Sequence, residues 1–535
     1  MTTPPTATAP AGSGGPSSPE ACAAPRADPG SPGPSHWWSD RVFYEVFVRS
    51  FADSNGDGTG DLKGLLNRLD DLNDGDPSTT TDLGVTGLWL MPVMASPSYH
   101  GYDVVDYRAV NPDYGTAGDF RALVEAAHAR GMAVIVDFPI NHTSSRHPWF
   151  VASAASDPAR ADWYVWRDTA PAAPGWHTSG TRWYYGLFGG DLPDLNLENA
   201  AVTAEVTELA RLWVGEMGAD GLRLDAAKHL VETDGVTENT AATHSWLRSF
   251  SAAVHETDPD ALLVGEVWDL SQVSASYVPA DVDMTFEFGL AQASVDSLRA
   301  GSATRLAAAL SDVAALERPD GFASFLTNHD QTRIATQLDG DLASLKLGAA
   351  LLLTGPGTPF VYYGEEIGLT GEKPDEQIRT PMPWDGSAPA AGFTTGTPWE
   401  PLAPGWETVN VAAERADAGS LLSWYRDMIR VRDDHPALRR GSIVPVGSDA
   451  DAVLATLRED RAETLLVLAN LSDRPVSDYA LELDAGPLCG LSRATLIVGA
   501  GQPAAPVVTR NGGFAGYRPL PELPPRSLSI VALEP

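Results

Sequence analysis

Cysteine is almost absent from this sequence of 535 residues, in which Cys22 and Cys489 are the only two. Two thiols are too few for a disulfide framework or for a thiolate zinc site. The sequence therefore argues against a disulfide-stabilised fold and against redox chemistry.

Positive charge is also scarce. Lysine occurs only at positions 63, 228, 346 and 373, and Lys and Arg together number 36 against 71 Asp and Glu. The formal net charge of -35 argues against nucleic acid or an anionic membrane surface as a partner, because both would repel the chain. A neutral substrate remains compatible with this charge.

Long hydrophobic runs are missing as well. The most apolar run, residues 347–363, is interrupted by Gly and Pro and falls short of the roughly 20 residues that a membrane span needs. Residues 1–36 are rich in Pro, Ser and Ala and lack both the basic start and the apolar segment of a signal peptide. We expect a disordered tail there, no membrane span and a cytoplasmic location, with secretion as the alternative.

Short apolar runs alternate with helical patterns from residue 37 onward, as they do in β/α units around a parallel sheet. Residues 117–131, for example, have apolar side chains at three- and four-residue spacing before a terminal glycine, which predicts a helix. Strands are expected over residues 42–48, 85–93, 132–138, 221–225, 261–267, 284–288, 322–328 and 359–364. Eight such strands predict a (β/α)8 TIM barrel.

Two segments depart from the alternation. Residues 143–199, after the third strand, are rich in Trp, Tyr, Gly and Pro and too long for an ordinary loop, so they predict an inserted domain. From about residue 440, short alternating runs predict a C-terminal antiparallel β-sandwich over residues 440–535. The barrel then comprises residues 37–142 and 200–439.

Polar residues follow several predicted strands, at the end of a barrel where catalytic groups gather. Three carboxylates on different strands, Asp225, Glu266 and Asp330, are hard to explain structurally, because burying acids that repel one another costs several kcal/mol. A single one could equally form a structural ion pair with a neighbouring arginine. Carboxylates held close together acquire different proton affinities, as glycoside hydrolysis requires.

Five segments in chain order resemble the sequence signatures of the α-amylase family of glycoside hydrolases. They are "DFPINHT" (137–143), "LPDLN" (192–196), "GLRLDAAKH" (221–229), "GEVW" (265–268) and "FLTNHD" (325–330). The resemblance implies that Asp225 is the nucleophile, that Glu266 is the general acid/base, and that Asp330 stabilises the distorted sugar.

The resemblance also implies residues that bind substrate. Arg223 can donate to Asp225 from the same face of its strand. Taken singly, a histidine or an aromatic residue here could equally belong to the core. Tyr102 would form an aromatic platform under the sugar at the cleavage site, and His142 and His329 would bind sugar hydroxyls. Trp268 would line the next subsite, and Lys228 and His229 would bind the glucose on the reducing side.

Residues 53–61, "DSNGDGTGD", begin like an EF-hand loop, with oxygen-bearing side chains at alternate positions. Gly64 stands where such a loop carries its bidentate Glu, so this is not a helix-loop-helix sensor. The alternative is a solvated acidic turn. The resemblance implies a structural Ca²⁺ site made by Asp53, Asn55, Asp57, the Thr59 carbonyl and Asp61.

The resemblance also implies a second calcium site between barrel and insertion, which would use Asn141, Asp194 and the His229 carbonyl. The sequence does not identify its acidic partner. We therefore treat the loop over residues 53–61 as the predicted metal site.

Three local features bear on the substrate that the resemblance implies. The pair Lys228 and His229 follows the proposed nucleophile, as in α-amylases, and Ala226 stands beside it. Tyr99 replaces an acidic residue that is common in exo-acting glucosidases. All three features favour internal α-1,4 bonds. The segments at 364–368 and 379–384 instead resemble α-glucosidases and trehalose synthases.

We therefore expect a retaining α-amylase of intermediate type, acting as a monomer on starch, glycogen or maltodextrins through a covalent glucosyl-enzyme. The alternative is an α-glucosidase or transglucosylase that acts on short maltooligosaccharides. A non-enzymatic scaffold subunit is disfavoured, because such chains lose the three carboxylates that Asp225, Glu266 and Asp330 provide here.

Overall fold

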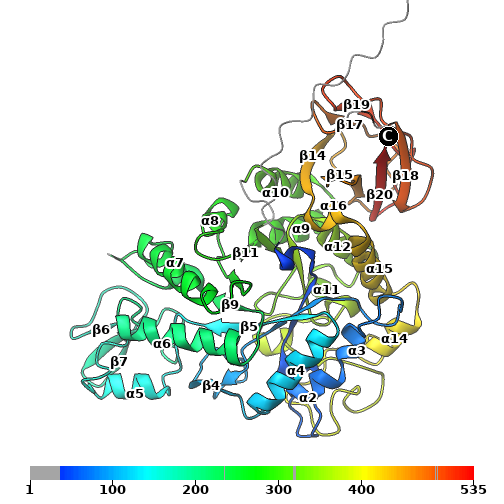
Figure 1. Ribbon diagram of the computed structural model, residues 1–535. Coiled ribbons are helices and arrows are strands. Elements are labelled where there is room, and N and C mark those ends of the chain that lie inside the picture. The colour runs from blue at the N-terminus through cyan, green and yellow to red at the C-terminus, as the bar shows by residue number, and fades with distance from the viewer. Residues whose placement is uncertain (1–35, 234, 317–320, 489, 491) are drawn as a thin grey trace, which may run out of the picture.

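The computed structural model describes residues 36–535 except 234, 317–320, 489 and 491. Eight parallel strands close into a barrel in the order β1-β13-β12-β11-β10-β9-β5-β2, which confirms the predicted fold class (Figure 1). Their bounds are β1 Phe43–Val46, β2 Gly87–Leu90, β5 Ala133–Pro139, β9 Gly221–Asp225, β10 Leu262–Gly265, β11 Met284–Phe286, β12 Phe322–Ser324 and β13 Thr358–Tyr362. The tail expected over residues 1–36 lies outside the described residues, apart from His36.

Aromatic and aliphatic side chains fill the inside of the barrel. Residues alternate along each strand, so Phe43 and Glu45 of β1 point to one side and Tyr44 to the other. Phe43 stacks on Phe360 of the neighbouring β13 with ring centroids 4.6 Å apart, and Trp89 packs near both. The interior is therefore a packed core of aromatic and aliphatic side chains.

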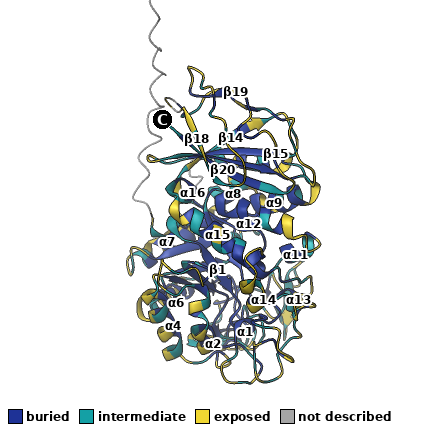
Figure 2. Cartoon of the chain, turned by 90° about the vertical axis from the view of Figure 1, so that its right-hand side faces the viewer, coloured by how far each residue is buried: buried dark blue, intermediate teal, exposed yellow. Residues whose placement is uncertain are grey.

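Helices surround the barrel, and their apolar faces cover its outer surface (Figure 2). The predicted helix at 117–131 is confirmed as α4, Ala117–Ala129, which begins with a capping box between Thr116 and Asp119. The others around the barrel are α1 Val48–Phe51, α2 Leu62–Asn67, α3 Leu69–Leu72, α6 Ala200–Arg211, α7 Ala241–His255, α8 Ser271–Ala275, α9 Phe288–Ala300, α10 Thr304–Ala314, α11 Ile334–Gln337, α12 Leu342–Thr354, α13 Asp375–Ile378, α14 Val411–Ala416, α15 Leu421–Asp434 and α16 Pro436–Arg440.

Shorter elements complete this layer. A two-stranded sheet pairs β3, Met94–Ala95, with β4, Asp106–Val110. The helical turns are η1 Trp37–Asp40, η2 Leu212–Glu216, η3 Ala227–His229 and η4 Glu365–Ile367.

The segment between β5 and α6 forms a separate small unit beside the barrel mouth. It contains α5, Pro148–Ala154, and a three-stranded sheet of β6 Trp166–Arg167, β8 Arg182–Tyr185 and β7 Trp176–Ser179. Its aromatic residues pack mainly against one another; Phe150, for example, contacts the ring of Tyr184 at 4.8 Å. The high aromatic content of residues 143–199 thus provides the core of this unit.

The C-terminal strands form an antiparallel sheet of seven strands, as predicted in type, in the order β18-β20-β16-β15-β14-β17-β19. Buried side chains from β15, β16 and β20 share one core with those of β17 and β19, so the two ends of the sheet face each other. The strands are β14 Ser442–Ser448, β15 Val453–Glu459, β16 Thr464–Asn470, β17 Leu481–Leu483, β18 Arg493–Val498, β19 Phe514–Tyr517 and β20 Ser527–Glu534.

The C-terminal sheet is joined to the barrel by buried hydrogen bonds. Arg458 on β15 is only 1% exposed, and its guanidinium donates to the carbonyls of Thr354, at the end of α12, and Leu438, in α16. Because a buried guanidinium must have its donors satisfied, these contacts fix the sheet against the barrel helices.

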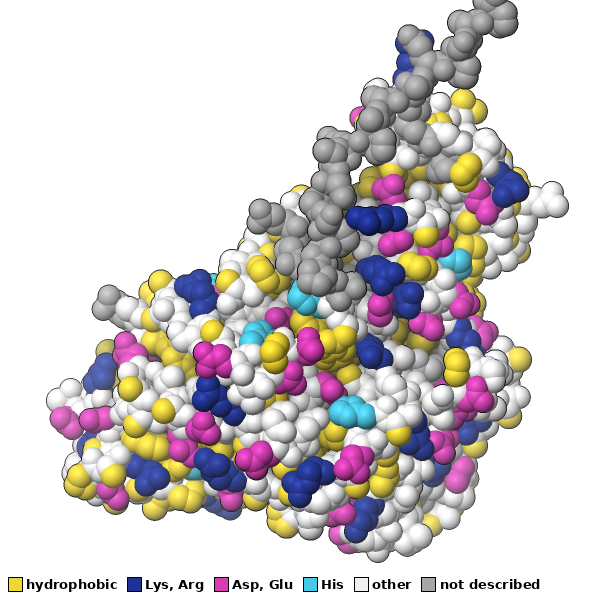
Figure 3. Space-filling model, in the orientation of Figure 1, with side chains coloured by type: hydrophobic (Ala, Val, Ile, Leu, Met, Phe, Trp, Pro, Cys, Tyr) yellow, Lys and Arg dark blue, Asp and Glu magenta, His cyan; other side chains and the backbone are white. Residues whose placement is uncertain are grey.

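Acidic and basic side chains are interspersed on the face of the molecule shown in Figure 3. Among the described residues visible there, no continuous basic stripe of the kind that binds nucleic acid is present. Among the residues that the structure describes, none of the helices has the length and apolar character needed to cross a lipid bilayer.

Candidate active site

Arg223 is the centre of the predicted site. It lies on β9 with its side chain 1% exposed, and its guanidinium contacts three carboxylates from three strand ends. Nη1 lies 2.9 Å from Asp137 Oδ1 and 2.7 Å from Asp225 Oδ1, while Nη2 lies 2.9 Å from Glu266 Oε2. The structure therefore brings together Asp225 and Glu266, the predicted nucleophile and acid, on a single cation.

The backbone after β9 turns sharply beside these groups. Ala226 has a left-handed conformation with φ of 51°, which is uncommon for a residue with a side chain. Its N–H donates to Glu266 Oε2 at 3.2 Å. This turn ends the strand immediately after Asp225 and helps to position the neighbouring Glu266.

Glu266 has the proton affinity expected of an acid catalyst. Burial raises the pKa of its carboxyl, the guanidinium of Arg223 opposes this, and the nearby charges of Asp225 and Asp330 raise the pKa further. The net effect is a raised pKa, which favours the protonated form that can donate to a leaving oxygen.

Asp330, the third predicted carboxylate, has the opposite electrostatics. Its Oδ2 lies 3.1 Å from His329 Nε2 and its Oδ1 lies 2.9 Å from Arg379 Nη2. Burial alone would raise the pKa of Asp330, but the cationic His329 and Arg379 outweigh it and hold the pKa well below its usual range. Asp330 is therefore a permanent anion beside the site, as stabilisation of a positively charged sugar requires.

Tyr102 forms one wall of the site. Its hydroxyl donates to Asp137 Oδ2 at 2.9 Å and contacts His329 Nε2 at 2.7 Å, and its ring stacks on that of His329 at 5.6 Å. Asp137 is fully buried; burial raises its pKa to about 7 although Arg223 opposes this. The ring of Tyr102 is thus fixed by contacts on two sides, as an aromatic platform requires.

The predicted sugar contacts at His142 and His229 lie side by side. The ring of Phe188, from the inserted unit, is 5.6 Å from that of His142 and 5.8 Å from that of His229. Burial lowers the pKa of His142 to about 4, so its imidazole is neutral at pH 7. Among the described residues, Nε2 of His142 has no hydrogen-bond partner.

The side chain of Trp268 is 52% exposed and stacks on Phe288 with ring centroids 4.7 Å apart. Trp268 therefore presents a flat aromatic surface to solvent near Glu266. Such a surface suits the predicted role of Trp268 in the subsite next to the cleavage site.

Lys228 has more protein contacts than a sugar-binding lysine needs. Its Nζ lies 2.7 Å from Glu238 Oε2 and 3.3 Å from Asp269 Oδ2, and it donates to the Trp268 carbonyl at 2.8 Å. These three acceptors use its three donors. Lys228 therefore ties the loop after β10 to Glu238, and any sugar hydroxyl would have to share or replace one of these contacts.

The predicted calcium loop is tightly folded. The side chains of Asp53, Asn55 and Asp57 each accept a hydrogen bond of 2.8 Å from the amide two residues later. Gly58 has φ of 95°, and a Cβ there would lie 1.9 Å from the Thr397 carbonyl oxygen, so only glycine fits this turn.

Asp61 has a structural role that the sequence did not predict. Its side chain caps α2 by accepting from the Gly64 amide at 2.8 Å, and it is 5% exposed. Among the described residues, no group of three or more His, Cys, Asp and Glu side chains has the arrangement of a metal site.

Glu232 lies beside Asp194, which was named together with Asn141 for a second calcium site. Asn141 Nδ2 donates to the His229 carbonyl at 2.7 Å, and the nearby Asp194 is buried next to Glu232. Burial and the charge of Glu232 raise the pKa of Asp194 well above its usual range, and burial raises that of Glu232 to about 7. Glu232 Oε1 has no hydrogen-bond partner among the described residues, so these oxygens suit a hard cation.

Sequence reasoning missed three residues that contact the predicted site. Glu45 on β1 contacts His329, Arg379 contacts Asp330, and Phe188 contacts His142 and His229. A signal existed for Glu45, because a lone acid within the apolar run "VFYEVFV" needs a buried partner. Arg379 begins the segment at 379–384, which was noted only for its resemblance to other relatives, and nothing in the local pattern marked Phe188.

The family described as "Alpha amylase, catalytic domain" matches residues 45–441 of the chain. The chain is 38% identical over 444 residues to Alpha-amylase 3 of Dictyoglomus thermophilum, an alignment that covers 82% of this chain and 85% of that protein. It is 34% identical over 517 residues to the trehalose synthase/amylase TreS of Mycobacterium tuberculosis, with 84% of each chain covered.

Among solved structures, the crystal structure of the alpha-amylase from H. orenii superposes with a TM-score of 0.80 at 40% sequence identity. The superposition covers 92% of this chain and 99% of that one. Similarity therefore extends over the barrel, the inserted unit and most of the C-terminal sheet, and it includes relatives with more than one named activity.

Proposed function

Because the chain belongs to the α-amylase family of glycoside hydrolases, we propose that it is a retaining α-amylase that cleaves internal α-1,4-glucosidic bonds. Its substrates would be starch, glycogen or maltodextrins. The observation that carries the proposal is the pair formed by Asp225 and Glu266, which contact the two ends of one guanidinium at 2.7 and 2.9 Å.

The reaction follows from the raised pKa of Glu266 and from the place of Asp225 beside it. Glu266 donates its proton to the glycosidic oxygen while Asp225 attacks the anomeric carbon, so the bond to the leaving glucan breaks as the glucosyl-enzyme ester forms. Glu266, now ionised, takes a proton from water, which attacks the same carbon and releases Asp225. The anion of Asp330 stabilises the oxocarbenium-like transition state of both steps.

The residues around position 99 support action within a chain rather than at its end. The ring of Tyr99 stacks on that of Trp399, with ring centroids 5.4 Å apart. At the position of Tyr99, exo-acting glucosidases of the family tend to carry an acidic residue that binds the terminal sugar. The aromatic pair of Tyr99 and Trp399 can support a further sugar ring by stacking. The nearby Arg379 is held by ion pairs with Asp330 and Asp375.

A second candidate is an α-glucosidase or transglucosylase that acts on short maltooligosaccharides. The contacts of Lys228 with Glu238 and Asp269 favour it, because they occupy the lysine expected to bind the reducing-side glucose of an amylase substrate. The similarity to a trehalose synthase/amylase points the same way.

Hydrolysis of maltoheptaose labelled at its reducing end should separate the two candidates. We expect mixed maltooligosaccharides in the first minutes, because an open cleft binds the chain in several registers. The products are resolved by chromatography. Glucose alone from the earliest time would contradict internal cleavage, and conversion of maltose to trehalose would indicate the transglucosylase.

We also propose that structural Ca²⁺ binds the loop of Asp53, Asn55, Asp57, Asp61 and the Thr59 carbonyl, with a second ion at Asn141, Asp194, Glu232 and the His229 carbonyl. Carboxylate and carbonyl oxygens are the ligands that Ca²⁺ prefers. At the second site, a cation would compensate the two neighbouring buried carboxyls, Asp194 and Glu232.

Removal of calcium with a chelator is expected to lower the midpoint of thermal unfolding. Calcium at about 100 times its Kd stabilises the folded state by about 2.7 kcal/mol, because it binds that state alone. Asp57→Ala should remove one ion per chain and Glu232→Gln the other, as measured by elemental analysis.

The control for this calcium prediction is Asp76→Ala. Asp76 lies in a similar exposed acidic turn, where its side chain accepts from the Ser78 amide at 2.9 Å, and it is not part of the proposed sites. An equal loss of metal in this variant, or no bound metal in the unaltered protein, would contradict the calcium proposal.

A further inference from the structure

Glu45 is an acidic residue buried inside the barrel, where apolar side chains predominate. It is 2% exposed and lies on β1 in register with Trp89 of β2 and Tyr362 of β13. Its Oε1 lies 2.5 Å from Nδ1 of His329. Burying a carboxylate costs several kcal/mol unless a partner compensates it, so this contact is the reason that Glu45 can occupy the core.

His329 is held between two carboxylates. It is fully buried, and its Nε2 faces Asp330 Oδ2 at 3.1 Å and the Tyr102 hydroxyl at 2.7 Å. Burial lowers the pKa of His329, but Asp330 and Glu45 outweigh it and raise the pKa to about 10. An imidazole with an acid on each nitrogen donates from both, as only the imidazolium can.

We propose that Glu45 is a positioning residue of the active site, which acts through His329 by keeping its ring an imidazolium, so that the positive charge on Nε2 stays beside Asp330. The proposal rests on the role given to Asp330 in the proposed function. Glu45 itself does not contact the reacting atoms, since His329 and Tyr102 lie between it and the carboxylates around Arg223.

The physical reason is the choice of proton on Nε2. If Glu45 were neutral, His329 would lose one of the two charges that stabilise its cation and would become neutral in the range where the enzyme works. A neutral ring that donates from Nδ1 has a lone pair on Nε2, which repels Asp330 instead of binding it. Asp330 would then keep Arg379 as its remaining cationic contact.

Other groups also set the charge of His329 and must be considered in any pH profile. Its ring stacks on Tyr102, its carbonyl accepts from Arg379 Nε at 2.9 Å, and Trp89 packs edge-on at 5.6 Å. The charged or titratable groups that face it are Glu45, Tyr102, Asp137, Asp330 and Arg379.

The test is Glu45→Gln, which keeps the size of the side chain and removes its charge. NMR of protein labelled with ¹⁵N-histidine measures the titration of His329 directly, with the signal assigned from its loss in His329→Asn. We expect His329 to remain protonated up to at least pH 8.5 in the unaltered protein and to titrate at lower pH in Glu45→Gln. We expect kcat on maltooligosaccharides to fall on the order of 10- to 100-fold, with a new loss of activity as the pH rises.

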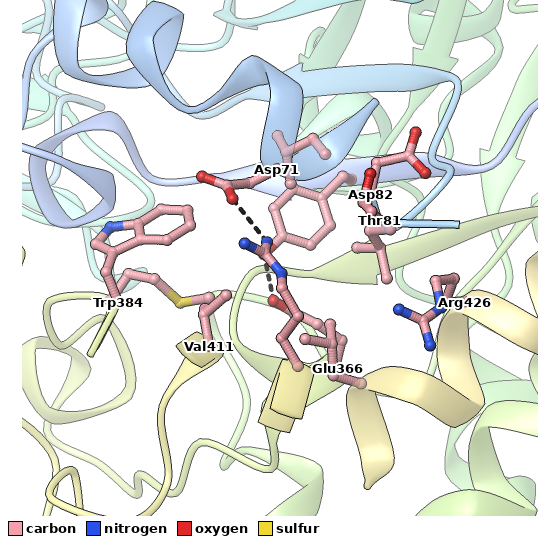
Figure 4. Close-up of a pocket in the computed structure, with 13 residues that line it drawn as sticks. Asp71, Thr81, Asp82, Glu366, Trp384, Val411 and Arg426 are labelled. Atoms are coloured by element: carbon pink, nitrogen blue, oxygen red, sulfur yellow. Dashed lines mark hydrogen bonds and ion pairs between the residues drawn. The ribbon is translucent and has the colours of Figure 1, made fainter. Parts of the chain in front are cut away.

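Glu366→Gln is the matched control. Glu366 is also 2% exposed, but it accepts from the outward-facing Tyr44 hydroxyl at 2.8 Å, on the opposite side of β1 from Glu45. It lines a small cavity of about 20 Å³ between the barrel and α3, α14 and α15, in which Arg415 pairs with Asp71 (Figure 4). Burial raises the pKa of Glu366 to about 7, and Glu366 lies on the other side of β1 from His329, so its replacement removes a buried acid without removing a partner of that ring. We expect unaltered His329 titration and kcat.

Glu45→Asp keeps the charge and should restore most of the His329 titration. The proposal is overturned if the titration of His329 in Glu45→Gln matches that in Glu366→Gln. If Glu45→Gln does not fold, the same measurement on the unaltered protein decides: a neutral His329 ring with an unprotonated Nε2 at pH 7 overturns the proposal. The NMR measurement needs no substrate. If the protein hydrolysed no α-glucan, the proposed function would be refuted, and the titration of His329 would still decide the proposal for Glu45.

Discussion

Replacing Asp225 by asparagine is expected to lower kcat on soluble starch by at least about 10³-fold, because no group remains to form the glucosyl-enzyme ester. The change keeps the shape of the side chain, and Arg223 retains its contacts with Asp137 and Glu266. The fold should therefore persist, as circular dichroism can check. The measurement is the release of reducing sugar.

The control for this substitution is Asp296→Asn. Asp296 also forms an ion pair with an arginine, Arg305 at 2.5 Å, but on the outer helices α9 and α10. Its replacement should leave kcat unchanged. If Asp225→Asn were as active as the unaltered enzyme, the assignment of the nucleophile would be refuted.

In Asp225→Ala, azide should restore turnover of an α-glucosyl fluoride and give the β-glucosyl azide. The azide anion attacks the anomeric carbon from the side on which the Asp225 carboxylate is missing.

Replacing Glu266 by glutamine should lower kcat on maltooligosaccharides by about 10²- to 10⁴-fold, because the leaving oxygen then departs without a proton. An α-glucosyl fluoride needs no such proton in its first step, so bond cleavage should be far less affected with that substrate. The ratio of the two losses, measured by stopped-flow kinetics, identifies the acid. Equal losses on both substrates would contradict the role of Glu266.

The pH profile gives the same assignment an independent check. Burial raises the pKa of Glu266 against the opposing Arg223, and the acid must be protonated to act. Activity of the unaltered enzyme should therefore fall as the pH rises through this raised pKa. The alkaline limb should disappear in Glu266→Gln, since the amide does not titrate.

The barrel strands were predictable because both faces of a parallel strand are buried, which leaves continuous apolar runs in the sequence. Two strands of the C-terminal sheet, β14 and β19, were not. Pro445 and Gly447 lie within β14, and residues of this kind normally mark turns. The strand β19 has only four residues, one of them Gly516 with φ of 62°. Their pairing depends on partners distant in the chain.

The convergence of the three proposed catalytic carboxylates was predictable because each lies at or after the end of a strand and within a recognisable segment. The partners of Lys228 were not predictable, since Glu238 and Asp269 come from two loops whose proximity is a property of the fold. For the same reason Glu232 was missed beside Asp194. Local sequence thus predicted which carboxylates gather, while many of their neighbours became visible only in three dimensions.

The filled interior of the barrel decides from which side its carboxylates can be reached. Phe43, Trp89 and Phe360 pack against one another inside the barrel and close its axis. Under the proposed function, a glucan chain therefore cannot pass along that axis. Polymer and water would both have to approach Asp225 from the face where the strands end, and the products would have to leave by the same face.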